Sequence, residues 1–175
     1  MKKQLLIAAF SFFGMQVQAQ VFQAAYRFSS PDHDQSQAVA TDAAGNVYTA
    51  GIYRGYFDAD PGAGVFNLPN SGGLAYDIFI IKMDAAGNFV WAKNVGGLSN
   101  DIVYALALDP SGNVCFTGNF GGTVDFDPGP SAFNLVSYGA TDIFACKLDA
   151  NGNFVWAKQL GGTSDETGYG IKSDA

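Results

Sequence analysis

Residues 88–97 read NFVWAKNVGG and residues 153–162 read NFVWAKQLGG, so one stretch of sequence occurs twice at an offset of 65 positions. A second stretch, DAAGNV at residues 42–47, recurs as DPSGNV at residues 109–114, at an offset of 67. Matches this long in nearly the same register do not arise by chance. They indicate an internal repeat of about 65 residues.

The remainder of the chain follows the same register. DADPG at residues 58–62 recurs as DFDPG at residues 125–129, again at an offset of 67. The offset falls to 65 within the segment PNSGGLAY at residues 69–76, so the second unit is two residues shorter there. A loop tolerates such a change because no strand pairing is interrupted. The chain therefore contains two units of one structure.

Each unit contains four runs rich in β-branched and aromatic residues, which we name A to D. In the second unit they are residues 101–108, 113–120, 142–148 and 153–160. Runs A and B, and likewise C and D, are joined by Asp-x-x-Gly-Asn, in which Asp accepts backbone N–H bonds and Gly supplies a positive φ. These are hairpin turns. Alternating strand directions place both turns at one end of the unit and the B–C and D–A loops at the other.

A four-stranded sheet of this size cannot bury both of its faces alone, so like sheets have to stack. We therefore predict an all-β protein, a β-propeller made of four-stranded antiparallel blades, with Trp91 and Trp156 packed between blades. Two complete blades do not close a ring, because propellers contain roughly 4 to 8. The expected architecture is an incomplete ring.

The run DIFxxKxDxxGNFVWAK, closed by Gly-Gly, spans residues 77–97 and again 142–162. It resembles the bacterial β-propeller repeat called SBBP. The resemblance covers nearly all of the chain after residue 19 and implies a secreted or surface-displayed propeller of a Gram-negative bacterium.

The N-terminus resembles a cleaved secretory signal. Lys2 and Lys3 precede an apolar run at residues 5–14, and Val17-Gln18-Ala19 fits an A-x-A type cleavage site. The apolar run is shorter than the roughly 20 residues that a membrane-spanning helix needs. We predict a signal peptide at residues 1–19 and an exported protein, extracellular or at the cell surface, with the periplasm as the alternative.

The repeat register sets the boundaries within the partial propeller, residues 20–175. They are 21–37 for a closing D strand and loop, 38–97 for blade 1, 98–162 for blade 2, and 163–175 for the start of a further blade. Residues 22–42 align with residues 154–174 without a gap, so the chain begins inside one blade and ends inside another. We expect a fragment whose partners include the remaining blades, and which self-associates when it is alone.

Composition excludes several classes of function. The chain has 9 Lys and Arg against 16 Asp and Glu, a formal charge of -7, which makes nucleic acid and anionic membranes poor partners. His33 is the sole histidine, so neither a zinc site nor a Ser-His-Asp triad can be assembled with a credible base. No catalytic or cofactor-binding residue is predicted, and we expect a protein that is not an enzyme.

Acidic residues gather in the B–C and D–A connections and form weak candidates for a Ca²⁺ site, since that ion takes roughly six to eight oxygen ligands. The stronger interpretation is structural, because Asp before Pro-Gly is a common turn former. The candidates are Asp34, Asp101 and Glu166 in D–A loops, and Asp58, Asp60, Asp125 and Asp127 in B–C loops.

Cys115 and Cys146 lie in runs B and C of the second unit, where the first unit has Tyr48 and Ile81. Export permits a disulfide, but buried cysteine often serves as a small apolar residue. We favour free thiols over a bridge.

Two functions of different class remain. The first is a non-catalytic extracellular module in which a rigid scaffold presents its loops to a protein or glycan, or serves as structural display. The second is the propeller part of a secreted polysaccharide-active enzyme whose catalytic residues lie elsewhere. Aromatic residues of the B–C segments either stack on sugar rings or pack beneath those segments: Tyr53, Tyr56, Phe57, Phe120 and Phe126.

Overall fold

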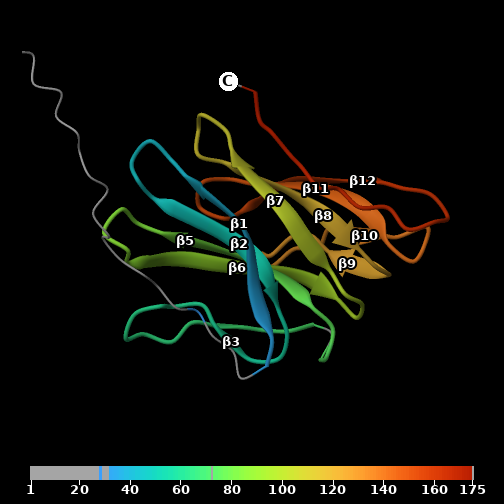
Figure 1. Cartoon of the computed structure of the whole chain (residues 1–175), viewed down its shortest axis with the longest axis horizontal. Coiled ribbons are helices and arrows are strands. Elements are labelled where there is room, and N and C mark those ends of the chain that lie inside the picture. Colours follow the sequence, from blue (N-terminus) through green and yellow to red (C-terminus); the bar gives the residue numbers. More distant parts are fainter. Residues whose placement is uncertain (1–27, 29–31, 72, 175) are drawn as a thin grey trace, which may run out of the picture.

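The computed structural model describes residues 28, 32–71 and 73–174, and every regular element among them is a β-strand (Figure 1). No helix long and apolar enough to cross a membrane occurs in that part of the chain. The predicted signal peptide and the closing D strand at residues 21–28 fall outside the described residues, apart from Phe28.

Each repeat unit contributes four antiparallel strands, as predicted; those of the second unit form a four-stranded sheet, whereas those of the first belong to a six-stranded sheet that also includes β9 (Thr123–Asp125) and β10 (Asn134–Val136) of the second unit. In blade 1 the strands pair in chain order, and in blade 2 the order is the same from β7 to β12. Blade 1 consists of β1 (Asp34–Thr41), β2 (Val47–Tyr53), β5 (Asp77–Met83) and β6 (Phe89–Gly97), and blade 2 of β7 (Ile102–Leu108), β8 (Val114–Phe120), β11 (Asp142–Leu148) and β12 (Phe154–Leu160).

The Asp-x-x-Gly-Asn motifs form the hairpin turns. In the first, the Asp42 carboxylate accepts hydrogen bonds from the backbone N–H groups of Ala44 and Asn46, both at 3.0 Å, and from the Asn46 side chain at 2.8 Å. The turns that begin at Asp84, Asp109 and Asp149 repeat this pattern. Their glycines have φ between 77° and 85°, a region that costs other residues energy.

The long B–C segments, which we call the excursions, contain short strand pairs. They are β3 (Phe57–Asp58) with β4 (Asn67–Leu68) in blade 1, and β9 (Thr123–Asp125) with β10 (Asn134–Val136) in blade 2. β9 also pairs with β6 of blade 1, with Gly96 opposite Asp125 and Gly97 opposite Val124. The excursion of blade 2 therefore joins the two blades by backbone hydrogen bonds.

One of the two buried clusters is shared by the blades, and the other lies on the leading face of blade 1 beneath its own excursion. Residues that pair across strands point to the same face, which gives blade 1 a trailing face, containing Tyr48, Ile78, Ile80 and Val95, and blade 2 a leading face, containing Phe116, Phe144, Cys146 and Leu148. All eight side chains belong to a single buried cluster. In Figure 1 the two sheets accordingly lie against each other, with β7 beside β1.

Trp91 occupies the predicted position between blades. Its indole Nε1–H donates a 3.2 Å hydrogen bond to the carbonyl of Ala150 in the C–D turn of blade 2, and the ring packs edge-on against Tyr48. Trp156 is the equivalent residue on the trailing face of blade 2. There it lines a hollow with Ile171 and Lys172 of the C-terminal segment and is not held between two blades.

The expected first strand of a further blade is not formed within residues 163–174. This segment makes one isolated bridge, between Asp165 and Thr141, and lies against blade 2 through hydrogen bonds from Gly168 N–H to the Gly118 carbonyl and from Ser173 Oγ to the Leu108 carbonyl. A strand requires a pairing partner, and the described residues offer no B strand beside this segment.

Both cysteines are buried free thiols, in agreement with the favoured prediction. Cys146 lies opposite Phe116 and Cys115 opposite Lys147 in the register of β8 and β11. The two thiols therefore point to opposite faces of the sheet, and this geometry excludes a bridge between them.

Candidate functional site

The candidate acids of the D–A loops include two that accept hydrogen bonds from backbone N–H groups at the ends of strands. Asp101 is fully buried and accepts hydrogen bonds from the backbone N–H groups of Gly97, at 2.7 Å, and Gly121, at 3.1 Å. Glu166 accepts one from Gly162 N–H at 3.0 Å, the equivalent position one repeat later. Asp34 occupies the corresponding place at the start of β1. At Asp101 this carboxyl group connects the end of blade 1 to blade 2.

A second buried acid, Asp77, lies near Asp101, where blade 1 meets blade 2. From sequence alone, Asp77 was recognised only as part of the repeat. Asp77 begins β5, is fully buried, and accepts a 2.6 Å hydrogen bond from Ser71 N–H, while its Oδ1 has no partner. Burial raises the pKa of Asp77 to about 6 and that of Asp101 to about 7, and repulsion from Asp77 adds to the latter. The only signal in the sequence was an Asp repeated at the start of run C.

The acids of the excursions satisfy hydrogen bonds within their own loops. Asp58 Oδ1 accepts from Asp60 N–H and Phe66 N–H at 3.1 and 2.9 Å, and Asp125 Oδ1 accepts from Asp127 N–H and Phe133 N–H at 3.0 and 2.8 Å. Asp60 and Asp127 cap the following Pro-Gly turns in the same way. These are the contacts of turn-forming residues.

The acids that the sequence singled out do not converge on one point. Among the described residues, no group of three or more His, Cys, Asp or Glu side chains is placed to hold a metal ion. The excursions also fold back along their blades, because Phe66 contacts Phe89 and Phe133 contacts Phe154, both with ring centroids 4.9 Å apart. The Ca²⁺ site stays a prediction from sequence.

His33 lies beside blade 1 in a small aromatic and cationic group. Its ring contacts Tyr76 edge-on at 5.4 Å, and the Arg54 guanidinium lies 5.7 Å from the centroid of the same Tyr76 ring. Neither a nucleophile nor a carboxylate bonded to this imidazole is present in the described residues. The group packs one loop against another.

Several exposed apolar side chains belong to the B–C and D–A loops. Because the end of β2 pairs with the start of β5, and the start of β5 with the end of β6, these loops lie at one end of the blades, which we call the loop end. Four large apolar residues there are between 56% and 85% exposed, and no residue of this kind lies in the four Asp-x-x-Gly-Asn turns at the opposite end. They are Tyr56, Leu74, Leu98 and Tyr138.

The aromatic residues of the B–C segments are mostly packing residues. Tyr53, Phe57, Phe120 and Phe126 are fully buried, whereas Tyr56 is more than half exposed. Of the five aromatics that the sequence offered for sugar stacking, only Tyr56 presents its ring to solvent. Stacking on a glycan would therefore have one exposed ring from these five aromatics, whereas a protein partner could contact all four exposed apolar residues of the loop end.

The repeated four-stranded units, stacked through one core, define a β-propeller-like repeat module. The chain is 33% identical over 101 residues to an uncharacterised WD repeat-containing protein of Acanthamoeba polyphaga mimivirus, a match that covers 50% of this chain and 7% of that protein. It is 28% identical over 90 residues to the regulatory protein FlaEY of Caulobacter vibrioides, covering 51% of this chain and 9% of the relative. The chain thus spans less than a tenth of either relative. It matches no family model.

Proposed function

We propose that this chain is a non-catalytic repeat module that binds a protein partner through its loop end. The observation that carries the proposal is the exposure of Tyr56, Leu74, Leu98 and Tyr138 at that end, whereas the four Asp-x-x-Gly-Asn turns contain no exposed large apolar residue. Large exposed apolar side chains on a rigid scaffold are typical of interaction surfaces. The likeness to a WD repeat-containing protein supports the same class of function.

Residues of the loop end are also where the two blades differ. The segment before β5 contains Leu74, whereas the shorter segment before β11 has Gly139 in that register and contains Tyr138 in the place of Ser71, although the strands on either side repeat closely. Loops of this kind change a binding surface without altering the scaffold.

A paired set of variants tests the proposal. Leu74→Lys with Tyr138→Lys alters the loop end, and Ala44→Lys with Asn151→Lys adds the same charge at the turn end. Each protein is immobilised and exposed to the secreted proteins of its source, and captured proteins are identified and their affinities measured with purified material. We expect a partner that binds wild type and the turn-end variant but loses at least about tenfold in affinity for the loop-end variant. Equal binding by both variants would refute the proposal.

We further propose that the module is an exported SBBP-type repeat protein, extracellular or at the cell surface, because residues 2–19 have the order of charge, apolar run and small residues of a secretory signal. N-terminal sequencing of the protein from the culture supernatant tests this. A mature chain that starts at Gln20 is the expected result, and an intact Met1 in the cytoplasm would contradict it.

A further inference from the structure

We propose that copies of this chain join head to tail, the trailing face of blade 2 of one copy packing on the leading face of blade 1 of the next. The contact between blades 1 and 2 within the chain is the template. It buries a trailing face against a leading face and adds the excursion strand β9 to the end of β6. The leading face of blade 1 and the trailing face of blade 2 are the two halves of the same kind of contact.

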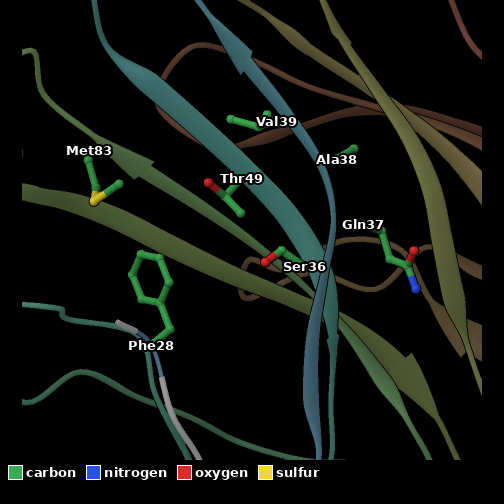
Figure 2. Close-up of a pocket in the computed structure, with 7 residues that line it drawn as sticks. All are labelled: Phe28, Ser36, Gln37, Ala38, Val39, Thr49 and Met83. Carbon is green, nitrogen blue, oxygen red and sulfur yellow. The ribbon is translucent and has the colours of Figure 1, made fainter. Parts of the chain in front are cut away.

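Most of the leading face of blade 1 is buried beneath its own excursion, but beside Val39 and Thr49 it contains a hollow where the template predicts a partner. Figure 2 shows Phe28, Thr49 and Met83 around this hollow, with Val39 beside Thr49. Thr49 stands where blade 2 has the larger and buried Phe116, and Val39 is 67% exposed although its equivalent, Leu106, packs against the shared core. In blade 2 the corresponding place is covered by the trailing face of blade 1.

The trailing face of blade 2 is the other half. Leu160 is 58% exposed, whereas its equivalent in blade 1, Val95, is 1% exposed because blade 2 covers it. Trp156 lies on the same face, in the position from which Trp91 reaches across to Ala150. In the joined copies Trp156 would donate to Ala85, the equivalent of Ala150 in the next copy.

Gly162, just after the end of β12, indicates most clearly where the second copy would bind. A Cβ added to Gly97 would lie 2.4 Å from the Thr123 carbonyl, because β9 passes alongside, so glycine is needed there. Its equivalent, Gly162, has nothing closer to such a Cβ than Glu166 Oε1 at 3.9 Å. The space beside Gly162 fits an excursion strand, and in a second copy that strand is β3, which is equivalent to β9.

The C-terminal segment competes with this contact. Residues 166–173 are equivalent to β1 and lie beside β7 as β7 lies beside β1, with the Tyr169 ring tilted against the Tyr104 ring at a centroid distance of 5.1 Å. On joining, β1 of the next copy takes this place, and the segment, which is not part of any sheet, leaves it.

The interface is heterologous, since the two faces that meet are different, and it therefore generates a ring or an open filament rather than a simple twofold dimer.

Sedimentation velocity over a range of concentrations tests the proposal, using the full chain and two matched variants. Gly162 has no positive φ, so Gly162→Val fits the single copy but blocks the incoming strand. It should remove the associated species or weaken the apparent Kd by at least about tenfold. Gly97→Val fills the space already occupied by β9, so it should lower the melting temperature of the single copy instead.

Circular dichroism at low concentration must show that Gly162→Val is folded, with a melting temperature equal to that of wild type. The proposal is overturned if wild type stays monomeric at every concentration, or if Gly162→Val associates as wild type does. A second readout is the fluorescence of Trp156 in a Trp91→Phe background. Its emission should shift to shorter wavelength with concentration, and an unchanged emission would also count against the contact.

Discussion

Asp77 and Asp142 occupy the same position in the two blades and differ in their donors. Burial raises the pKa of Asp142, but hydrogen bonds from Gln159, Tyr138 and Gly139 outweigh burial and bring it below its usual value. Gln159 also donates to the Val136 carbonyl. Asn94, its equivalent in blade 1, is one methylene shorter and donates only to the matching Pro69 carbonyl, which leaves Asp77 Oδ1 unpaired.

Replacing Asn94 with Gln should supply the missing donor. We expect Asn94→Gln to raise the free energy of unfolding by about 1 kcal/mol and to lower the pKa of Asp77 from about 6. Chemical denaturation and an NMR titration of the Asp77 carboxyl measure the two effects. Gln159→Asn is the matched reverse change and should raise the pKa of Asp142. The explanation fails if Asn94→Gln leaves the titration of Asp77 where it was.

The contribution of Asp77 and Asp101 to the free energy of unfolding should fall as the pH rises. Asp77 and Asp101 have folded pKa values above the ordinary 3.8, so the folded state binds more protons than the unfolded state between about pH 4 and pH 7. Their contribution to stability is therefore complete below pH 4 and is lost as the pH rises through about 6 to 7. The turn aspartates, whose pKa values are lowered, act in the opposite sense at more acidic pH.

Asp101→Asn separates the contribution of this one carboxyl. The variant loses an acceptor for Gly97 or Gly121 at every pH, but it never has to hold a buried charge. Its deficit in unfolding free energy relative to wild type should therefore be larger at about pH 5 than at about pH 8. Chemical denaturation at the two pH values measures this, and a deficit that grows with pH would contradict the account.

The hairpin turns depend on a single backbone conformation. Gly112 has φ of 77°, and a Cβ there would meet nothing closer than 3.7 Å, so substitution costs backbone strain without a steric clash. We expect Gly112→Ala to lower the free energy of unfolding by about 1 kcal/mol, and Gly112→Asn to cost less because Asn tolerates positive φ. Thermal unfolding of the two variants measures the difference. A turn that tolerated Ala as well as Asn would not have this conformation.

The strands and turns could be predicted from sequence because their signals are local. Asp-x-x-Gly-Asn at residues 109–113 specifies its turn without reference to the rest of the chain, and the flanking runs show their strand propensity directly. The pairing of β9 with β6 could not be predicted, because it involves only two residue pairs distant in sequence. The burial of Asp77 was also missed, because a repeated Asp has the same sequence pattern whether it forms an exposed turn or is buried between blades.

At the scale of the whole molecule, the shared core should make the two blades unfold together. Side chains of both blades form one buried cluster, so neither blade keeps its apolar face dry without the other. We expect a single cooperative transition, with tryptophan fluorescence and far-ultraviolet circular dichroism giving the same midpoint. Two separate transitions, one for each repeat unit, would show that the blades are independent.

The central claim is that like sheets stack as blades, and the contact of Trp91 with Ala150 tests it most directly. Nuclear Overhauser effects from the Trp91 indole N–H of the labelled chain report which protons lie beside it. The account predicts cross-peaks to Ala150 of blade 2 and slow exchange of this N–H with water, because it donates to the Ala150 carbonyl. Cross-peaks confined to blade 1, with exchange as fast as in an exposed indole, would contradict it.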